Sequence, residues 1–169
     1  MSDKLDLIIA GRSQEVRYQM AYDIVYKLTK DHRQADLLSL LEHKLTTHLH
    51  KQYAELPTVS SSLTLFKILQ DAGAIIGKMA EICLFLDVNY CQKELALPLR
   101  KRLGDYLLKS LYTETKALAI TAESVFASRD GSQAECKALL EFVGRLDEKE
   151  EFFERYLLGY YEPLLKKHY

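Results

Sequence analysis

The chain has 169 residues, with 23 lysines and arginines against 24 aspartates and glutamates, which leaves a formal net charge of −1. Phosphate binding draws on an excess of clustered basic residues, so this balance argues against a nucleic-acid-binding protein. Three cysteines do not describe a disulfide framework and favour a reducing, intracellular setting, and no apolar run approaches the roughly 18 residues of a membrane span.

Seven glycines and three prolines leave room for few turns, which favours long helices over many strands. The predicted fold class is therefore all-α, a bundle of about eight or nine helices counted from the periodic segments. We expect a single helical domain over residues 1–169.

The first long helix is predicted from Ser13, which can cap it, to Lys30. At about 100° per residue, its aliphatic side chains share one arc, and three tyrosines four residues apart form an adjoining stripe: Tyr18, Tyr22 and Tyr26. Two interpretations are open. The stripe is core, wedged between neighbouring helices with its phenol tips at solvent, or it is a recognition ridge, because tyrosine combines a rigid ring with a polar tip.

Further helices follow from three- and four-residue spacing of apolar residues. The next helix, ending before Pro57, has its predicted core positions at Leu37, Leu38, Leu41, Leu45, Leu49 and Tyr53. Residues 63–91 also have a helical pattern, which we expect to divide into a short and a longer helix around Asp71, Gly73 and Gly77. The remaining helices are predicted over residues 99–111, 115–127 and 133–143, with a last, aromatic-rich one from about residue 148.

Catalytic and metal-binding motifs are not evident. The densest metal-competent group lies on one helix: Glu42, His43, His48 and His50. His43 and His50 are about 10 Å apart by helical rise, too far to bind one ion without another element, so solvated histidines are favoured. Cys83 and Cys91 are about 12 Å apart by the same rise and are expected to be core thiols. The basic run at 100–102 is expected to be a solvated face, and we expect no metal, no cofactor and no enzymatic activity.

Several segments resemble cullin N-terminal domains, in the same order. Residues 17–26 (RYQMAYDIVY) resemble the second helix of that family, and residues 38–50 resemble the third. Residues 78–90 (KMAEICLFLDVNY) resemble the fifth helix, and residues 148–161 are similar to a later helix rich in phenylalanine and tyrosine. The turn at 126–132 is a poorer match. The resemblance covers roughly residues 14–161.

The resemblance implies a cullin-repeat-like bundle that acts as a non-catalytic scaffold module of a cullin-RING ubiquitin ligase. Cullins dock an adaptor of the BTB/POZ fold through their second and fifth helices, and here the adaptor type that carries an F-box substrate receptor is favoured. Carried over by position, the adaptor-facing residues are Tyr18, Tyr22, Tyr26 and Phe85, joined by Asp87, Val88 and Tyr90. The expected location is cytoplasmic and nuclear.

In cullins the RING subunit binds a C-terminal region that these residues do not include, so it is expected to join only through such a region. Two interpretations stay open: a part of a divergent cullin, which the uncapped apolar final helix favours, or a small stand-alone relative that binds adaptors. The alternative from a different class is a helical structural or regulatory protein, homodimeric through its final helix, with a buried tyrosine stripe. Solvent exposure of the three tyrosines separates these possibilities.

Overall fold

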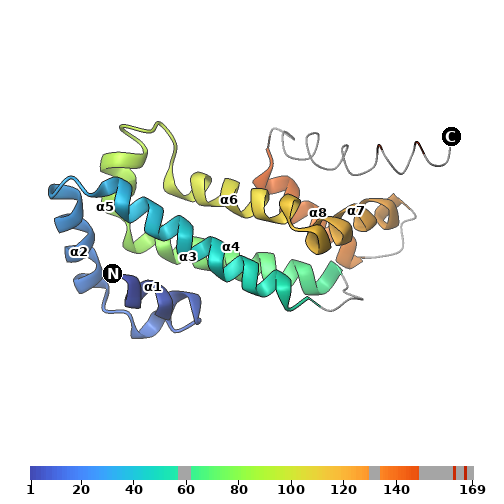
Figure 1. Ribbon diagram of the computed structural model, residues 1–169, viewed down its shortest axis with the longest axis horizontal. Helices are drawn as coiled ribbons and strands as arrows, with labels where there is room; N and C mark the ends of the chain where they lie inside the picture. Colours follow the sequence, from blue (N-terminus) through green and yellow to red (C-terminus); the bar gives the residue numbers. More distant parts are fainter. Residues whose placement is uncertain (57–61, 130–133, 149–161, 163–165, 167–169) are drawn as a thin grey trace. The chain divides into compact units, whose positions relative to one another are not determined.

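The computed structural model describes residues 1–56, 62–129 and 134–148, together with residues 162 and 166. Within these residues the chain forms helices and turns and no strand, so the predicted all-α fold is confirmed. The expected last helix, from about residue 148, lies almost wholly outside the described residues. Figure 1 shows the helices, labelled in chain order.

The described elements are eight α-helices, one 3₁₀ turn and one π-helical turn. In chain order they are α1 Ser2–Ile9, η1 Ser13–Glu15, α2 Tyr18–Lys30, α3 Gln34–Ala54, α4 Ser62–Ile82, α5 Leu84–Leu86, η2 Asp87–Cys91, α6 Leu99–Thr113, α7 Thr115–Arg129 and α8 Ala134–Leu146. Helix α5 is a single turn, and η2 is the π-helical turn that follows it directly.

The start of α2 differs from the prediction. Ser13 begins only the short 3₁₀ turn η1, and the α-helix begins at Tyr18. Between them Val16 has an extended backbone and a buried side chain, 5 % exposed. The extended conformation of Val16 separates η1 from α2, so Ser13 does not cap the helix that carries the tyrosines, and Arg17 is its N-cap residue.

The predicted break within residues 63–91 is wrong, because α4 runs unbroken from Ser62 to Ile82 (Figure 1). Buried side chains recur at alternating four- and three-residue steps through the glycines, at Leu65, Leu69, Ala72, Ile76, Met79 and Cys83. A helical glycine costs about 1 kcal/mol relative to alanine. Burial of each large apolar side chain contributes roughly 1.5 to 3 kcal/mol and outweighs that cost. The interruption falls later, at Cys83, where α5 begins.

The contacts divide the chain into two compact units, which are described separately. Unit 1 comprises residues 1–49 and 71–106, and unit 2 comprises residues 50–70 and 107–169. The α3 leucines predicted as core are all buried, those up to Leu49 in unit 1, and Tyr53 is fully buried in unit 2. Phe66 and Phe142 of unit 2 meet edge to face, with 6.0 Å between ring centroids.

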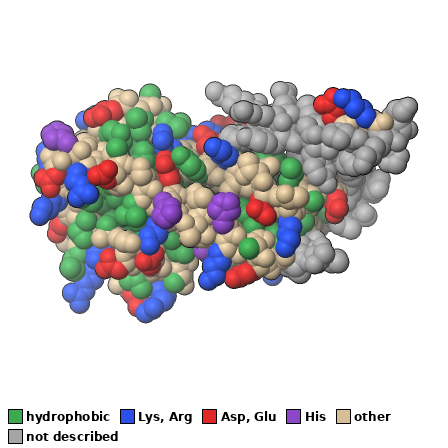
Figure 2. Space-filling model, in the orientation of Figure 1, with side chains coloured by type: hydrophobic (Ala, Val, Ile, Leu, Met, Phe, Trp, Pro, Cys, Tyr) green, Lys and Arg blue, Asp and Glu red, His purple; other side chains and the backbone are tan. Residues whose placement is uncertain are grey.

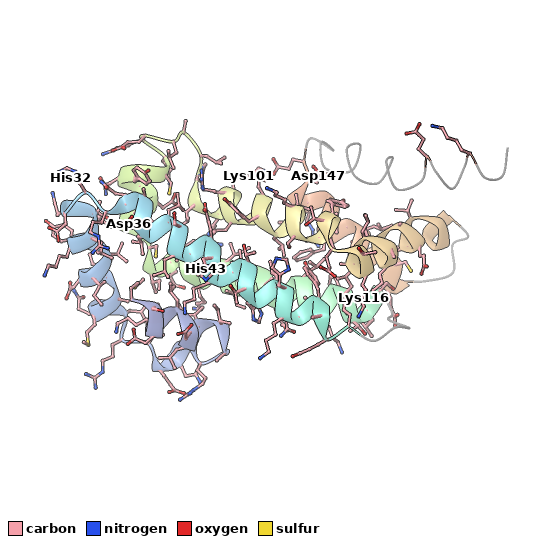
Figure 3. All side chains as sticks on the ribbon, viewed as in Figure 1. His32, Asp36, His43, Lys101, Lys116 and Asp147 are labelled. Atoms are coloured by element: carbon pink, nitrogen blue, oxygen red, sulfur yellow. The ribbon has the colours of Figure 1, made fainter. Side chains whose placement is uncertain are left out.

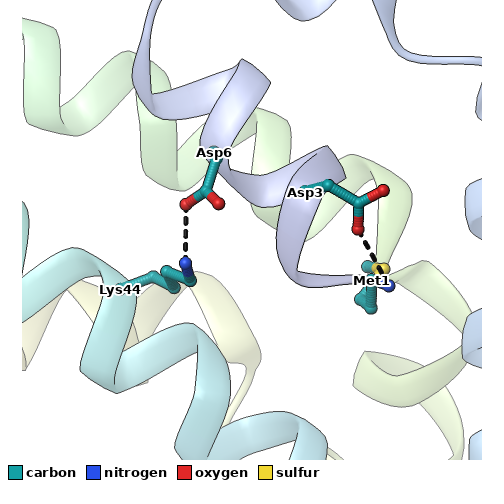
Figure 4. A network of polar contacts seen from close by, with 4 residues as sticks. All are labelled: Met1, Asp3, Asp6 and Lys44. Carbon is teal, nitrogen blue, oxygen red and sulfur yellow. Dashed lines mark hydrogen bonds and ion pairs between the residues drawn. The ribbon is translucent and has the colours of Figure 1, made fainter.

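An ion pair joins α1 to α3 within unit 1. Lys44 Nζ lies 2.6 Å from Asp6 Oδ1, and the N-terminal amine lies 3.6 Å from Asp3 Oδ1 (Figure 4). The Lys44–Asp6 pair is partly exposed, so it contributes about 1 kcal/mol or less, and Asp3 is fully exposed. The main attachment of α1 is the burial of Leu5 and Ile8.

Helices α1 and α2 end in the same hydrogen-bonded motif with different residues. Gly11 and His32 have positive φ angles, 74° and 57°, at the first position beyond each helix cap. The closing amide-to-carbonyl distances are 3.1 and 2.8 Å at Gly11 and Arg12, and 3.2 and 2.9 Å at His32 and Arg33. This is the Schellman arrangement, which favours glycine because a Cβ strains the left-handed conformation. His32, in the turn between α2 and α3 (Figure 3), carries that strain.

On the face drawn in Figure 2, acidic and basic side chains are interspersed, without a large area of one sign. None of the helices in the described ranges combines the length and apolarity needed to cross a membrane.

Candidate interaction surface

The tyrosine stripe of α2 lies at the surface of unit 1. The buried face of α2 consists of Ala21, Val25 and Thr29. The stripe lies beside that face, and each successive tyrosine is displaced by about 40° around the helix axis. The exposed fractions of Tyr18, Tyr22 and Tyr26 are 39 %, 41 % and 44 %. The three rings are therefore exposed and are not part of the buried face of α2.

Phe85 of α5 lies against this stripe. Its ring centroid is 4.9 Å from that of Tyr26, in a tilted arrangement, and 6.3 Å from that of Tyr22, edge to face. Such pairs contribute about 0.5 to 1.5 kcal/mol beyond the area they bury. The structure thus brings together predicted residues from two distant parts of the sequence. We call Tyr18, Tyr22, Tyr26 and Phe85 the tyrosine surface.

Exposed apolar side chains continue along the segment that holds Phe85. Val88, which the sequence analysis names, is 41 % exposed, and Leu84, which it does not name, is 54 % exposed. The two are four residues apart and therefore share a side of the helical segment. That spacing was the signal available for Leu84, but a leucine inside an apolar run is more often core.

Asp87 lies in the interior, which corrects its expected position on the docking surface. It is 9 % exposed. Its Oδ1 accepts a hydrogen bond of 2.8 Å from the first amide of α6, at Leu99, and its Oδ2 accepts one of 3.0 Å from Gln92 Nε2. The first amides of a helix have no partner within it, so a carboxylate from elsewhere in the chain satisfies one here. Asp87 therefore fastens η2 to the start of α6.

Tyr90 is partly exposed at the end of η2. Its carbonyl oxygen accepts the amides of Glu94 and Leu95, at 2.8 and 3.2 Å. The backbone of Tyr90 thus stabilises the turn beyond η2, and no aromatic contact joins its ring to those of the tyrosine surface.

A shallow depression adjoins the N-terminal end of the stripe. It has a volume of about 200 Å³ and is lined by Tyr18, Gln19, Tyr22, Glu81 and Ile82. Sites for small-molecule ligands begin at roughly 300 Å³. The depression is thus smaller than a typical substrate pocket.

A lysine stands over the first and the last ring of the stripe. Lys78 Nζ of α4 lies 5.9 Å from the ring centroid of Tyr18, and Lys30 Nζ lies 5.5 Å from that of Tyr26. Lys78 is also paired with Glu81, at 3.1 Å, and this hydrogen bond raises the pKa of Lys78. A lysine ammonium group therefore lies at each end of the tyrosine stripe, and the one at the Tyr18 end is ion-paired.

The most buried ion pair of unit 1 lies away from the tyrosine surface. Arg102 Nε of α6 donates to Glu42 Oε1 of α3 at 2.7 Å, and their side chains are 31 % and 15 % exposed. This hydrogen bond raises the pKa of Arg102, and burial raises the pKa of the neighbouring Tyr106. A charge pair of this kind links α3 to α6.

The cysteines are buried thiols. Burial raises the pKa of Cys83 to about 12 and that of Cys91 to about 11, so both are protonated near neutral pH and are weak nucleophiles. Cys136 is also buried, 3 % exposed. In the part of the chain that the structure describes, no group of three or more His, Cys, Asp or Glu side chains is arranged to hold a metal ion.

Comparisons with protein-family models, with curated proteins and with solved structures give no match. A functional interpretation therefore depends on the order of the sequence patterns and on the exposed aromatic residues. The structural observation that bears most directly on function is the contact between the tyrosines of α2 and Phe85.

Proposed function

We propose that this chain is a non-catalytic, adaptor-docking module of a cullin-type ubiquitin ligase scaffold. The proposed partner is an adaptor of the BTB/POZ fold that carries an F-box substrate receptor. It docks on the tyrosine surface, with Leu84 and Val88 at its margin. The observation that carries the proposal is the exposed tyrosine stripe of α2 in contact with Phe85, because cullins dock adaptors through the helices that these segments resemble.

The physical character of the surface supports protein recognition. Three exposed rings spaced one turn apart on a rigid helix, backed by a fourth from a packed neighbour, form a compact aromatic cluster. Tyrosine is enriched at binding hot spots because its ring buries a large area at a low cost in side-chain entropy. Tyr22 is the central ring, and its truncation is expected to cost about 2 kcal/mol of binding, roughly thirtyfold in affinity.

The test is calorimetric titration of the chain with an F-box-type adaptor complex. We expect Tyr22→Ala to weaken binding at least tenfold. Met20→Ala is the matched control, because Met20 lies on the same helix, two residues away and on another side, and is 49 % exposed. Circular dichroism establishes that each variant is folded.

Two results would overturn the proposal. One is the absence of binding by the folded wild-type chain to this adaptor and to the other BTB-fold adaptors. The other is an equal loss of affinity in Tyr22→Ala and Met20→Ala, which would place the contact elsewhere on α2. Self-association that Tyr22→Ala abolishes, without adaptor binding, would instead identify the surface as a contact between copies of the chain.

A further inference from the structure

The two ends of the tyrosine stripe differ in charge. At the Tyr18 end the ammonium group of Lys78 is neutralised by Glu81, 3.1 Å away. At the Tyr26 end Lys30 stands over the ring, and no carboxylate of the described residues lies within ion-pair distance of it. The stripe therefore has one neutral end and one cationic end.

A partner that covers Tyr26 also removes water from the ammonium group of Lys30. Desolvation of an unpaired charge is costly, and a carboxylate at hydrogen-bonding distance offsets it. At the other end Lys78 already has its counter-ion, so an added carboxylate would also approach Glu81 and be repelled. A carboxylate of the partner would therefore be favourable at the Lys30 end of the stripe and unfavourable at the Tyr18 end.

We infer that the docked protein places a carboxylate against Lys30 and an uncharged surface against the Tyr18 end. This arrangement fixes the direction in which the partner lies along α2, because the reversed orientation would leave Lys30 buried without a counter-ion and set the carboxylate beside Glu81. The inference rests on the proposed function of the tyrosine surface and specifies the chemistry and polarity of its partner.

Charge reversal tests the inference in the same calorimetric titration with the F-box-type adaptor complex. We expect Lys30→Glu to weaken binding at least tenfold and Lys30→Gln to weaken it less. Lys27→Glu is the matched control, since Lys27 is an exposed lysine in the same last turn of α2, about 100° around the helix from Tyr26. We expect it to change the affinity less than twofold, because both reversals affect the helix dipole alike.

Salt dependence gives the second readout. The wild-type affinity is expected to fall as salt is raised, and that of Lys30→Glu to fall less or to rise, because the attractive pair has become a repulsive one. Equal effects of Lys30→Glu and Lys27→Glu, with an unchanged salt dependence, would overturn the inference. If the wild type binds and only Tyr22→Ala weakens it, the proposed function stands and the inference alone fails. If the wild type does not bind, both fail.

Discussion

Tyrosines occupy two contrasting environments in this chain. In unit 1, Tyr18, Tyr22 and Tyr26 of α2 are each about two-fifths exposed, whereas in unit 2 the rings of Tyr53 and Tyr112 are buried, at 0 % and 2 %. Tyr53 extends the line of buried leucines along α3 at four-residue spacing, so its ring falls on the buried arc. The tyrosines of α2 advance beside such an arc. Tyr22 and the buried Val25 are about 60° apart around α2, so a rotation of that size separates an exposed ring from a core residue.

The hydroxyl groups differ accordingly. Tyr53 Oη lies 3.3 Å from Ser110 Oγ within unit 2, and burial raises the pKa of Tyr53 to about 12. Burial also raises the pKa of Tyr112. The Tyr53 phenol is thus buried, protonated and hydrogen-bonded within the fold, whereas an exposed phenol can hydrogen-bond to water or to another molecule.

The largest expected difference is in stability. Tyr53→Ala should lower the free energy of unfolding by about 3 to 5 kcal/mol, because it leaves a cavity where a full ring was packed. Tyr22→Ala should cost about 1 kcal/mol or less, since its ring is exposed and loses one edge-to-face contact. Urea denaturation followed by circular dichroism measures both. Similar losses in the two variants would mean that the rings are not in contrasting environments.

Alkaline pH should reduce the contribution of the Tyr53 hydroxyl group to stability by about 1 kcal/mol. The pKa of Tyr53 is raised from 10.0 when unfolded to about 12 when folded. Its contribution is therefore fully present below pH 10 and is lost as the pH rises through 12. The stability advantage of the wild type over Tyr53→Phe should shrink by about 1 kcal/mol between roughly pH 9 and pH 11. Other alkaline transitions cancel in this difference, and an advantage that stays constant would mean that the Tyr53 phenol is not shielded from water.

The smallest expected effect separates stability from recognition. His32→Gly should raise the free energy of unfolding by about 0.5 to 1 kcal/mol, because glycine adopts the positive φ at the end of α2 without strain. Gly11→Ala should lower it by a similar amount in the equivalent motif of α1. Thermal denaturation measures both changes. The affinity for the proposed adaptor should not change in His32→Gly, and a loss of affinity there would show that the turn beyond Lys30 also takes part in docking.

The sequence pattern predicted the α3 core well, because leucines at three- and four-residue spacing have one obvious buried arc and all of them lie on it. It also placed α6 and α7 to within two residues of their observed bounds. The leucine spacing of α3 and the proline just before α6 are signals within the local sequence, and local reasoning is most reliable where such signals are present.

The failures occur where long-range contacts decide. Nothing in the local sequence reveals that buried packing carries α4 through its two glycines, or that Val16 shortens α2. Asp87 was misplaced because its partner, the amide of Leu99, is twelve residues away. Leu84 was overlooked because an apolar run does not show which of its members faces solvent. In each case the deciding interaction involves a residue beyond the helical turn in question.

The anchoring of Asp87 bears on the entropy of docking. Because its carboxylate ties η2 to the first amide of α6, the segment from Leu84 to Val88 is attached to two helices before any partner arrives. Ordering a loose segment on binding would cost about 1 to 2 kcal/mol per residue, and here folding has already met that cost. Phe85 is thus presented on a preorganised support, and if the proposed docking holds, differences in affinity among partners should arise mainly from how long each complex persists.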